Sequence, residues 1–561
     1  MTTAKIAKIF KKWYSLEGAL KKLHGEIDLN FCLTTNKNTQ FVVKISPLYK
    51  KDRILFESAL LEKLSEAKVK NIPLLVKDKE GAAYKIISHE NKEASIIRIL
   101  SWVPGRSWGS VHPITKNLRE QLGLQMGAIT TALKGFEHPH DRTKNDWDLA
   151  QSLWVKNHMS LFSPEEQKLL HPFVSAFQEN LAAYNSLPKG VVHNDANDQN
   201  IMLSPDLIDP TITGIIDFGD ACYTQIINDV AIGCTYTIMG YPDPLQAALP
   251  LVSGYHSQYH LTESAIAHLY TAIGMRLVVS LTKAAINKRT RPENTYLLYS
   301  EKAAWALIEK WSKLSPTLAH FAFRKACGYF AHPNTEGFIK WTSQQEVSIQ
   351  SIFPELDQKK VHHLDLSVSS LWVENEARFN DLDYFEFKIQ QLQKKHPQAV
   401  IAGGYLEPRP LYTSEDYDVS SNSGPISRCV HLGVDFWLPS QTAVHSPFDA
   451  NVVMALDRKG EKEYGGFVVL AHESPAGPFF SLYGHLDPAS ILAGRPFRRF
   501  KKQRKLGPAP SLPNLTRSFR IQRRFPWSTN PPKSRNMEGS LPRPQLFVET
   551  KRTVSPPTES S

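Results

Sequence analysis

The chain has 561 residues, of which 42% are hydrophobic and 22% are charged, with a formal net charge of +11. This length predicts two or three domains, and the composition is that of a globular protein. The five cysteines form no CxxC pair. That spacing excludes a cysteine-based zinc site and favours reduced thiols over a disulfide framework.

The positive charge lies almost entirely at the C-terminal end. Residues 495–561 hold sixteen of the 66 Lys and Arg side chains and only three of the 55 Asp and Glu, so the rest of the chain is nearly neutral. The same segment has eleven prolines and no histidine. We expect a disordered, basic, Pro-rich tail. Such tails are usually only solvated, and this one has no aromatic pattern, so a nucleic-acid partner is not expected.

The ends of the chain and its most apolar stretch indicate a cytoplasmic protein. Residues 1–22 lack the apolar core and cleavage site of a secretory signal, although their basic, amphipathic character leaves a mitochondrial presequence as a minor alternative. The apolar stretch 265–285 is interrupted by His268 and Arg276. It therefore predicts a buried helix, not a membrane span. No membrane and no partner protein are implied.

The first hundred residues predict a small sheet with one helix between its strands. Apolar periodicity places a helix in 1–20, strands near 30–34 and 40–46, a helix at 52–67, and strands at 83–88 and 95–102. From 113 to about 340 the pattern is mainly helical, with short strands at 200–203 and 212–217.

The remainder predicts a second, β-rich region. Residues 341–397 read as a linker followed by a helical segment at about 370–395, and strand-like segments then dominate 398–487. We expect an α+β protein with five parts: 1–102, 103–340, 341–397, a β-rich domain at 398–494, and the tail at 495–561.

Residues 191–200, "VVHNDANDQN", place unusually dense polar chemistry directly behind a strand-like run. Asn200 begins the strand "NIML", and the return strand "ITGIID" ends at Asp217, so a hairpin can place Asn200 and Asp217 side by side. Phosphoryl transfer needs a carboxylate near the acceptor hydroxyl and oxygen ligands for Mg²⁺ on the nucleotide. Asp195 is predicted to orient that hydroxyl and take its proton, while Asn200 and Asp217 hold the metal. His193 is expected to hold the loop by hydrogen bonds and not to act as a base, since it takes the place of the histidine of H-R-D in protein kinases. Either half of this pattern alone would indicate only a polar turn.

"HNDANDQN" followed by "IIDFGD" resembles the catalytic and metal-binding loops of the aminoglycoside phosphotransferase and choline kinase superfamily, relatives of the protein kinases. The resemblance implies a bilobal protein-kinase-like fold, with a sheet-rich N-lobe at 1–102 and a helical C-lobe at 103–340. Lys44 in "FVVKIS" would bind nucleotide phosphates, and Glu57 on the next helix would pair with it. "IRILSWVPGRSW" (97–108) would be the hinge between the lobes, and "GEIDLNF" (25–31) resembles the hairpin that covers the nucleotide.

"GVVHNDANDQNIML", "GIIDFGDACY" and "VAIGCTYTIM" (230–239) are together similar to the hydroxylysine kinases. That similarity implies phosphorylation of the 5-hydroxyl of hydroxylysine, with GTP as the preferred donor and Mg²⁺ as cofactor. The residues themselves indicate only a kinase, using GTP or ATP, of a small hydroxylated molecule such as an amine. Choline or ethanolamine, homoserine and an aminoglycoside remain alternative acceptors. Asp220 either faces a substrate ammonium or caps a turn.

A second constellation lies in the β-rich region, in "HLGVDFW" (431–437) and "LYGHL" (482–486). His431 and Asp435 are donor types that zinc readily takes. The segment resembles lysostaphin-like zinc endopeptidases, which implies His431 and Asp435 as zinc ligands and His485 as an assistant in catalysis. The third ligand of that family comes from a downstream H-x-H, and no histidine follows His485 here. We therefore expect a truncated peptidase-like domain without a working zinc site, and a zinc hydrolase is disfavoured.

Overall fold

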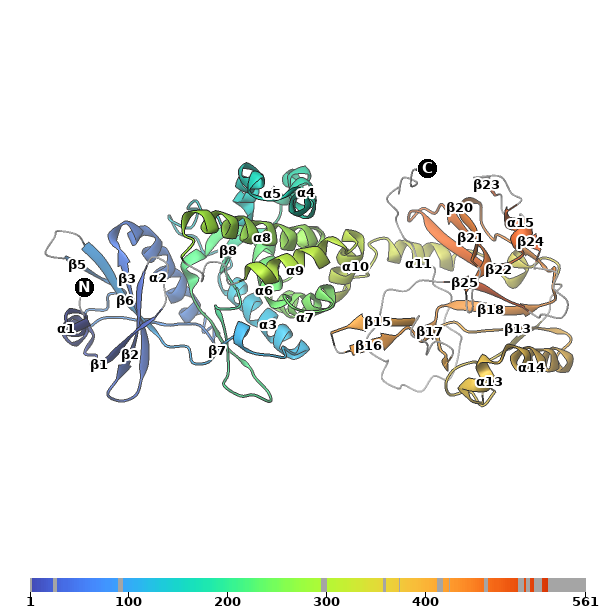
Figure 1. The fold of residues 1–561 in the computed structure, drawn as a ribbon, viewed down its shortest axis with the longest axis horizontal. Helices are drawn as coiled ribbons and strands as arrows, with labels where there is room; N and C mark the ends of the chain where they lie inside the picture. Colours follow the sequence, from blue (N-terminus) through green and yellow to red (C-terminus); the bar gives the residue numbers. More distant parts are fainter. Residues whose placement is uncertain are drawn as a thin grey trace. The chain divides into compact units, whose positions relative to one another are not determined.

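The computed structural model describes residues 3–23, 28–88, 94–293, 300–356, 360–372, 374–410, 417–422, 424–458, 463–492, 499–500, 505–508 and 517–522 (Figure 1). The chain divides into two compact units, Met1–Tyr329 and Phe330–Ser561. Residues 25–27 of the predicted nucleotide-covering hairpin lie outside the described residues.

The first unit begins with a sheet-rich lobe. Its elements are α1 (Thr3–Tyr14), β1 (Gly18–Leu23), β2 (Leu29–Thr35), β3 (Gln40–Pro47), η1 (Leu48–Lys50), α2 (Lys51–Glu66), β4 (Leu75–Val76), β5 (Lys85–Ser88) and β6 (Ala94–Ser101). Among the described residues the strands form one six-stranded sheet of order β1-β2-β3-β6-β4, with β5 also pairing β6. The strands predicted near 30–34, 40–46, 83–88 and 95–102 and the helix predicted at 52–67 are confirmed.

Both faces of this sheet are covered, which explains why β3 and β6 are apolar without strict alternation. On one face Val43, Ile45 and Ile97 pack against Ile6 and Phe10 of α1. On the other face the sheet meets α2, whose Phe56, Leu60 and Leu61 share a core with Leu100 of β6. Figure 1 shows α1 and α2 on opposite sides of the strands. The face toward α2 also carries Lys44, directly across from Arg98 in the β3–β6 register.

The second lobe is mainly helical, as predicted. Its elements are β7 (Arg106–Ser107), η2 (Trp108–Ser110), α3 (Lys116–Ala132), η3 (Leu149–Leu161), α4 (Pro164–Glu179), α5 (Leu181–Asn185), β8 (Lys189–Val192), β9 (Ile201–Leu203), β10 (Ile212–Ile215), η4 (Phe218–Asp220), β11 (Cys222–Gln225), α6 (Ile227–Thr237), α7 (Pro244–Gln258), α8 (Glu263–Thr290), α9 (Glu301–Ser312) and α10 (Pro316–Ala326). The predicted hinge leads from β6 into β7, which pairs with β9 of this lobe.

Close helix packing sets the frame of this lobe. A Cβ at Gly123 on α3 would lie 2.1 Å from the carbonyl oxygen of Leu251 on α7, and one at Gly254 on α7 would lie 2.3 Å from that of Glu120. Only glycine therefore allows these two backbones to approach so closely.

Helix α8 is the one described helix long and apolar enough to cross a membrane, and 83% of its most apolar window is buried inside the protein. Thr262 caps its start by accepting a hydrogen bond from Ala265 N, and Lys288 and Arg289 lie in its last turn, where cations are favourable. The prediction of a buried helix at 265–285 is confirmed.

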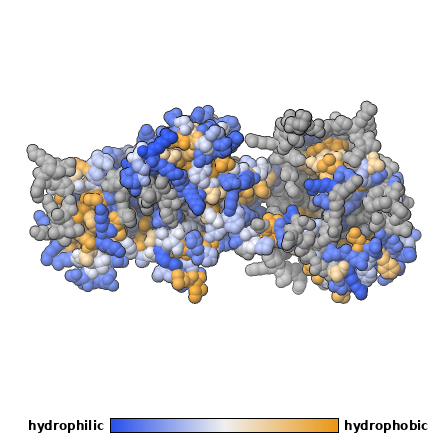
Figure 2. Space-filling view, in the orientation of Figure 1, coloured by the Kyte–Doolittle hydropathy of each residue, from blue (hydrophilic) through white to orange (hydrophobic). Residues whose placement is uncertain are grey.

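Two short antiparallel pairs carry the polar loops. Strand β8 pairs β11 from Lys189↔Gln225 to Val192↔Cys222, and β9 pairs β10 from Leu203↔Ile212 to Ile201↔Ile215. The β9–β10 turn exposes Leu207 and Ile208, and Figure 2 shows this tip as an apolar protrusion.

The second unit is built around a large sheet. Its elements are α11 (Thr335–Ser343), α12 (Ile349–Ile352), β12 (Lys360–His363), α13 (Glu376–Asn380), α14 (Leu382–Lys395), β13 (Ala399–Gly403), β14 (Glu407–Pro408), β15 (Asp418–Ser421), β16 (Gly424–Ser427), β17 (Val430–His431), β18 (Gly433–Leu438), β19 (Ala443–His445), β20 (Ala450–Arg458), β21 (Gly465–His472), β22 (Phe479–Leu486), α15 (Pro488–Leu492), β23 (Arg499–Phe500), β24 (Lys505–Pro508) and β25 (Arg517–Gln522). Eight of the described strands form the order β12-β13-β18-β25-β22-β21-β20-β23.

The predicted linker at 341–365 differs from the structure. Ile352, Phe353 and Leu356 are buried in the core of the second unit together with Phe436 and Tyr483. The helix α11 that precedes them belongs to the same unit, because its Trp341 ring lies 5.4 Å from Phe448 and 5.3 Å from Phe479. The apolar side chains of this segment are buried, so it behaves as part of the domain and not as a connector.

The predicted disorder at 495–561 also differs from the structure in three places. The described parts of this segment are strands β23, β24 and β25, and β25 pairs antiparallel with β18 from Gly433↔Gln522 to Leu438↔Arg517. In "RSFRIQ" apolar Phe519 and Ile521 alternate with polar residues, a short strand pattern that the proline-rich surroundings obscure. The rest of 495–561 lies outside the described residues.

Candidate active site

The loop between β8 and β9 is held in an unusual backbone conformation. Asn194 has a φ of 64°, and its N–H donates to Asp229 Oδ1 at 3.0 Å. Asp229 is buried, and burial raises its pKa to about 7. Because left-handed backbone is costly for a residue with a side chain, this bond from α6 stabilises the loop just before Asp195.

His193 holds the same loop from the other side. Its Nδ1 accepts from Asp195 N at 3.2 Å, which leaves Nε2 to donate to the carbonyl oxygen of Ile216 at 3.0 Å. Its ring lies 4.5 Å from the Phe218 ring. Burial lowers the pKa of His193 to about 4, so the ring is neutral at physiological pH. Both ring nitrogens are occupied by backbone groups, as a residue that holds the loop requires.

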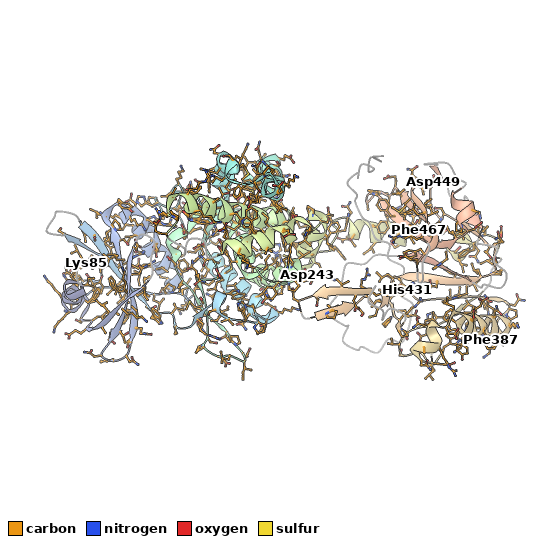
Figure 3. The ribbon with its side chains drawn as sticks, viewed as in Figure 1. Lys85, Asp243, Phe387, His431, Asp449 and Phe467 are labelled. Carbon is orange, nitrogen blue, oxygen red and sulfur yellow. The ribbon has the colours of Figure 1, made fainter. Side chains whose placement is uncertain are left out.

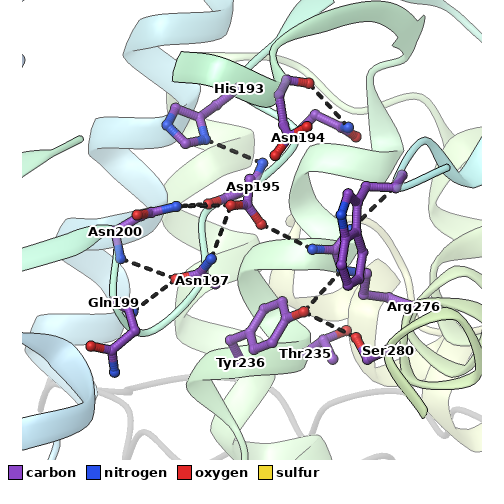
Figure 4. Close-up of polar contacts among 12 residues, drawn as sticks. His193, Asn194, Asp195, Asn197, Gln199, Asn200, Thr235, Tyr236, Arg276 and Ser280 are labelled. Carbon is purple, nitrogen blue, oxygen red and sulfur yellow. Dashed lines mark hydrogen bonds and ion pairs between the residues drawn. The ribbon is translucent and has the colours of Figure 1, made fainter. Parts of the chain in front are cut away.

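Both oxygens of the Asp195 carboxylate accept hydrogen bonds (Figure 4). Oδ2 accepts from Asn197 Nδ2 and from Asn200 Nδ2, each at 2.9 Å, and Oδ1 accepts from Arg276 Nη2 at 3.0 Å. The side chain keeps 19% exposure, so it remains reachable. Burial and the negative charge of Asp220 raise the pKa of Asp195, whereas the Arg276 guanidinium acts to lower it and favours the carboxylate form.

Arg276 is a site residue that sequence reasoning missed. It lies on α8 with 1% of its side chain exposed, and Nε donates to the Tyr236 hydroxyl at 3.3 Å while Nη1 donates to the Trp147 carbonyl at 3.2 Å. Its Cζ lies 4.7 Å from the Trp147 ring centroid and 5.3 Å from that of Tyr236, whose hydroxyl reaches Ser280 Oγ at 3.0 Å. The guanidinium is therefore fixed on every side. The sequence feature that could have indicated this role is a single arginine within an apolar helical stretch.

The hairpin brings the two predicted metal ligands together. Ile216 N donates to the carbonyl oxygen of Asn200 at 2.9 Å, so Asp217 follows directly beside Asn200. Asp217 has a φ of 61°, and its Oδ1 accepts from Gly219 N at 3.3 Å. The same oxygen lies 3.0 Å from Lys44 Nζ, whose charge holds the pKa of Asp217 at about 2. The half-exposed carboxylate is thus ionised.

The predicted ion pair between Lys44 and Glu57 is wrong, because each side chain pairs with another residue. Glu57 Oε2 lies 2.7 Å from Arg98 Nη2, with 2% of each side chain exposed, while Lys44 pairs with Asp217. The sequence does not indicate Arg98 as the partner of Glu57, because the position of Arg98 opposite Lys44 depends on the β3–β6 register. Glu57 still acts on Lys44 through its charge and, together with Asp217, raises the pKa of that lysine despite burial.

Helix α2 also reaches the metal-binding loop. Arg53 Nε donates to the Gly219 carbonyl at 2.8 Å, so the helix that carries Glu57 is tied to the loop that carries Asp217. Asp220, at the end of this loop, accepts from Asn145 Nδ2 at 3.3 Å through its carboxylate, and its carbonyl oxygen accepts from Asn194 Nδ2 at 3.2 Å. Burial raises the pKa of Asp220.

The donor set fits a Mg²⁺–nucleotide complex. Asn200 uses Nδ2 to bond the Asp195 main chain and side chain, which leaves its carbonyl oxygen Oδ1 as a ligand beside the ionised Asp217. No group of three or more His, Cys, Asp or Glu side chains suited to a metal occurs in the described part of the chain. Two oxygen ligands are nevertheless enough for Mg²⁺, which commonly takes one or two protein groups together with substrate phosphates.

The sequence model of the phosphotransferase enzyme family, APH, matches residues 20–262. This part of the chain is therefore similar to the phosphotransferases of that family. The matched range contains the N-lobe sheet, the hinge, and the loops that hold Asp195, Asn200 and Asp217. The match to this family agrees with the predicted enzyme class, a phosphotransferase acting on a hydroxyl group.

Individual relatives are similar at low identity. Hydroxylysine kinase of Mus musculus is 26% identical over 239 residues, which are 40% of this chain and 63% of that protein. Homoserine kinase of Bradyrhizobium diazoefficiens is 30% identical over 217 residues, 37% of this chain and 60% of that protein. The solved structure of amicoumacin kinase hAmiN, in complex with AMP-PNP, Ca²⁺ and Ami, is 16% identical with a TM-score of 0.44, and the match covers 56% of this chain and 96% of that one. The chain thus spans less than two thirds of these two curated relatives.

In the second unit, the structure also brings His431 and Asp435 together. His431 Nε2 lies 3.7 Å from Asp435 Oδ1, and His431 Nδ1 lies 2.6 Å from the Gly404 carbonyl. The other Asp435 oxygen, Oδ2, lies 2.7 Å from Arg409 Nη1, and Arg409 Nε lies 2.5 Å from Glu407 Oε2. These charged side chains are all buried (His431 is labelled in Figure 3).

The zinc-ligand roles that the peptidase resemblance implies do not fit this arrangement. Arg409 takes one oxygen of Asp435 and leaves Oδ1, which faces His431 Nε2 at 3.7 Å. Two protein ligands are too few for a catalytic zinc site, which normally has three and a water. His485 lies on β22, which is separated from β18 in the sheet by β25. In the β18–β25 register Asp435 stands opposite Arg520, so this neighbouring strand brings no zinc-ligand residue type to that position.

Proposed function

We propose that the phosphotransferase domain transfers the γ-phosphate of GTP or ATP to a hydroxyl of an amino-acid or amino-alcohol acceptor, with 5-hydroxy-L-lysine as the leading candidate. The observation that carries the proposal is the carboxylate of Asp195. It is oriented by three donors yet partly exposed, and it stands beside the Asn200–Asp217 hairpin.

In this proposal the protein contributes positioning and electrostatics. Phosphoryl transfer passes through a loose transition state, so catalysis depends on holding the acceptor oxygen in line with the phosphorus and on stabilising charge. Asp195 binds the acceptor hydroxyl and takes its proton as the bond to phosphorus forms. Asn197, Asn200 and Arg276 keep its carboxylate in one orientation. His193 remains neutral and fixes the loop.

The nucleotide would be held by groups from both lobes. Asn200 Oδ1 and Asp217 would hold Mg²⁺. The ammonium of Lys44, which pairs with Asp217, would also contact the nucleotide phosphates. Bound Mg²⁺ supplies neutralisation of the phosphate charge. Glu57 forms its ion pair with Arg98 and acts on Lys44 only through its charge, and the Arg53–Gly219 bond keeps the Asp217 loop beside α2.

The acceptor assignment rests on charge near Asp195. In 5-hydroxylysine an ammonium sits on the carbon next to the reacting hydroxyl carbon, and Asp220 interacts electrostatically with Asp195 from the adjacent loop. Asp220 is a suitable partner for that ammonium. Homoserine, which lacks this second amine, is the main alternative, because one similar protein is a homoserine kinase. Choline or ethanolamine and aminoglycosides follow.

The test is an acceptor panel. The purified chain is assayed with Mg²⁺ and either GTP or ATP on 5-hydroxylysine, homoserine, choline, ethanolamine and an aminoglycoside, with D195N as the blank. Phosphorylation of 5-hydroxylysine with the highest kcat/KM supports the specific proposal. No turnover of 5-hydroxylysine, with turnover of another acceptor, replaces the substrate and keeps the enzyme class.

For the second unit we propose a lysostaphin-like β domain that binds no zinc. The proximity of His431 and Asp435 on adjacent short strands supports the likeness, and the Arg409–Asp435 pair supports the absence of zinc binding. Stoichiometric zinc in the purified protein, together with peptide hydrolysis, would overturn this proposal.

A further inference from the structure

A partly exposed group of charged and aromatic side chains lies near the candidate active site. It consists of Asp146, Trp147, Trp154 and Lys283, here called the Trp147 cluster. Lys283 Nζ lies 2.6 Å from Asp146 Oδ2, and it lies 5.0 Å from the Trp154 ring centroid and 5.9 Å from that of Trp147. Trp154 Nε1 donates to the Asp146 carbonyl at 3.1 Å, which fixes the indole beneath the pair. Both charged groups reach solvent, with 23% of Lys283 and 45% of Asp146 exposed.

The cluster is connected to Asp195 through one aromatic ring. Arg276 lies against the Trp147 ring and donates to Asp195, whereas Lys283 lies at a greater distance from the same ring. Arg276 and Lys283 are seven residues apart on α8, so they share a face and are separated by about 10 Å along the helix axis. Asn145, the residue before the cluster, reaches the Asp220 carboxylate.

This separation suits an amino acid with a hydroxyl at the end of its side chain. In extended 5-hydroxylysine about 7 Å separates the hydroxyl and carboxylate oxygens, taking roughly 1.2 Å of advance for each bond as in an extended peptide. Adding contacts of about 3 Å at each end gives a reach of about 13 Å. That reach exceeds the spacing of about 10 Å along α8 between Arg276, which donates to Asp195, and Lys283. An acceptor without an amino-acid head group would leave the cluster unused.

We propose that Lys283 and Asp146 bind the α-carboxylate and α-ammonium of an amino-acid acceptor whose hydroxyl lies at Asp195. The inference rests on the proposed kinase function and names its substrate class. A zwitterionic head group carries opposite charges on one carbon, and the Lys283–Asp146 pair offers opposite charges side by side. The lysine ammonium has three donors, of which its hydrogen bond to Asp146 uses one, so a carboxylate can join without breaking the pair.

The test compares K283M with K288M on matched acceptors. Lys288 lies on the same helix and pairs with Glu301 at 2.5 Å, so its substitution also removes an ion-paired lysine from α8 but leaves the Trp147 cluster intact. The acceptors are 5-hydroxylysine, homoserine, and the decarboxylated analogue of 5-hydroxylysine, assayed with Mg²⁺ and the nucleotide that the wild-type protein prefers.

K283M is expected to raise KM for the two amino acids about ten-fold or more, because a charged hydrogen bond to the carboxylate is lost. Its kcat and its KM for nucleotide should stay within about two-fold, and K283R should restore most of the affinity. The decarboxylated analogue should show the same KM with wild type and K283M. K288M should change none of these values.

Three outcomes would overturn the inference. An unchanged KM for the amino acids in K283M would refute the contact between Lys283 and the carboxylate. An equal rise in KM for the decarboxylated analogue would show that Lys283 has only a structural role. A wild-type protein that phosphorylates the decarboxylated analogue but neither amino acid removes the head-group site and leaves the kinase function standing. If the wild-type protein phosphorylates no acceptor of any class, the proposed function fails together with this inference.

Discussion

Each unit of the protein contains a carboxylate paired with a buried arginine, and the two pairs differ in what else reaches the carboxylate. In the first unit Asp195 lies 3.0 Å from Arg276 and keeps 19% exposure. In the second unit Asp435 lies 2.7 Å from Arg409 and keeps 3% exposure. The first arginine orients an acid that a substrate can still reach, whereas the second neutralises an acid that nothing outside reaches.

The surroundings explain this difference. The second oxygen of Asp195 accepts from two asparagine amides, which leave the carboxylate partly solvated and close to the ionised Asp217. Arg409 is itself held by Glu407, so Asp435 belongs to a closed buried network. A carboxylate paired with arginine can therefore serve in a reaction or only in stabilising the fold. In this protein the exposure of the carboxylate distinguishes the two cases.

The largest expected effect is that of substituting Asp195, the carboxylate assigned to the reaction. D195N keeps the size of the side chain but removes its negative charge, so we expect kcat for acceptor phosphorylation to fall about a thousand-fold. Nucleotide affinity should change little, because Lys44, Asn200 and Asp217 remain. Steady-state kinetics and nucleotide binding by calorimetry measure the two effects. Near-wild-type turnover in D195N would contradict the assignment.

Removing the arginine of the second unit should affect stability and not transfer. R409M leaves Glu407 and Asp435 buried without their cation, which is expected to destabilise the second unit by about 4 kcal/mol. Hydrogen exchange at β18 and β22 amides reports this local loss. The control is R458M, since Arg458 is 65% exposed in its pair with Glu463 and should contribute little. A loss of phosphoryl transfer in R409M would contradict the separation of the two networks.

Acidification should destabilise both units through one buried histidine in each. Burial lowers the pKa of His193 and of His472 to about 4. The unfolded histidines take up protons near pH 6.5. The unfolded state therefore binds more protons between these values, and the free energy of unfolding falls as pH drops from 6.5 toward 4. Each histidine accounts for about 3 kcal/mol.

Urea unfolding at a series of pH values, followed for each unit by hydrogen exchange, measures this dependence. H193Q should remove part of the slope in the first unit only, and H472Q part of the slope in the second only. An unchanged slope in both variants would assign the pH dependence to other groups.

The smallest expected effect sharpens the role of Arg276. R276K keeps the cation but loses the planar fork that contacts Asp195, Trp147 and Tyr236 together. We expect kcat to fall about ten-fold while KM for nucleotide is unchanged, since only the orientation of Asp195 is disturbed. The same kinetic assays measure this. An equal rise in nucleotide KM would show instead that α8 supports the lobe as a whole.

Local patterns in the sequence were sufficient for the fold of the first unit and for the core of its site. Val and Ile runs predict β3 and β6, and apolar periodicity predicts α2 and α8. The spacing of Asp195, Asn200 and Asp217 predicts a hairpin, because two short strands joined by a turn return the chain to its starting edge. These features depend on residues close together in the chain.

What the tertiary structure decided are the contacts between distant segments. Glu57 pairs with Arg98, and Lys44 pairs with Asp217, in place of the predicted Lys44–Glu57 pair. These partners depend on the β3–β6 register and on the distance between the lobes. Arg276 and Lys283 sit on an apolar helix whose pattern predicts burial but not which polar group it meets. The same holds for Arg409 and for the pairing of β25 with β18. Charged partners are chosen by three-dimensional proximity and shared burial, which sequence periodicity does not encode.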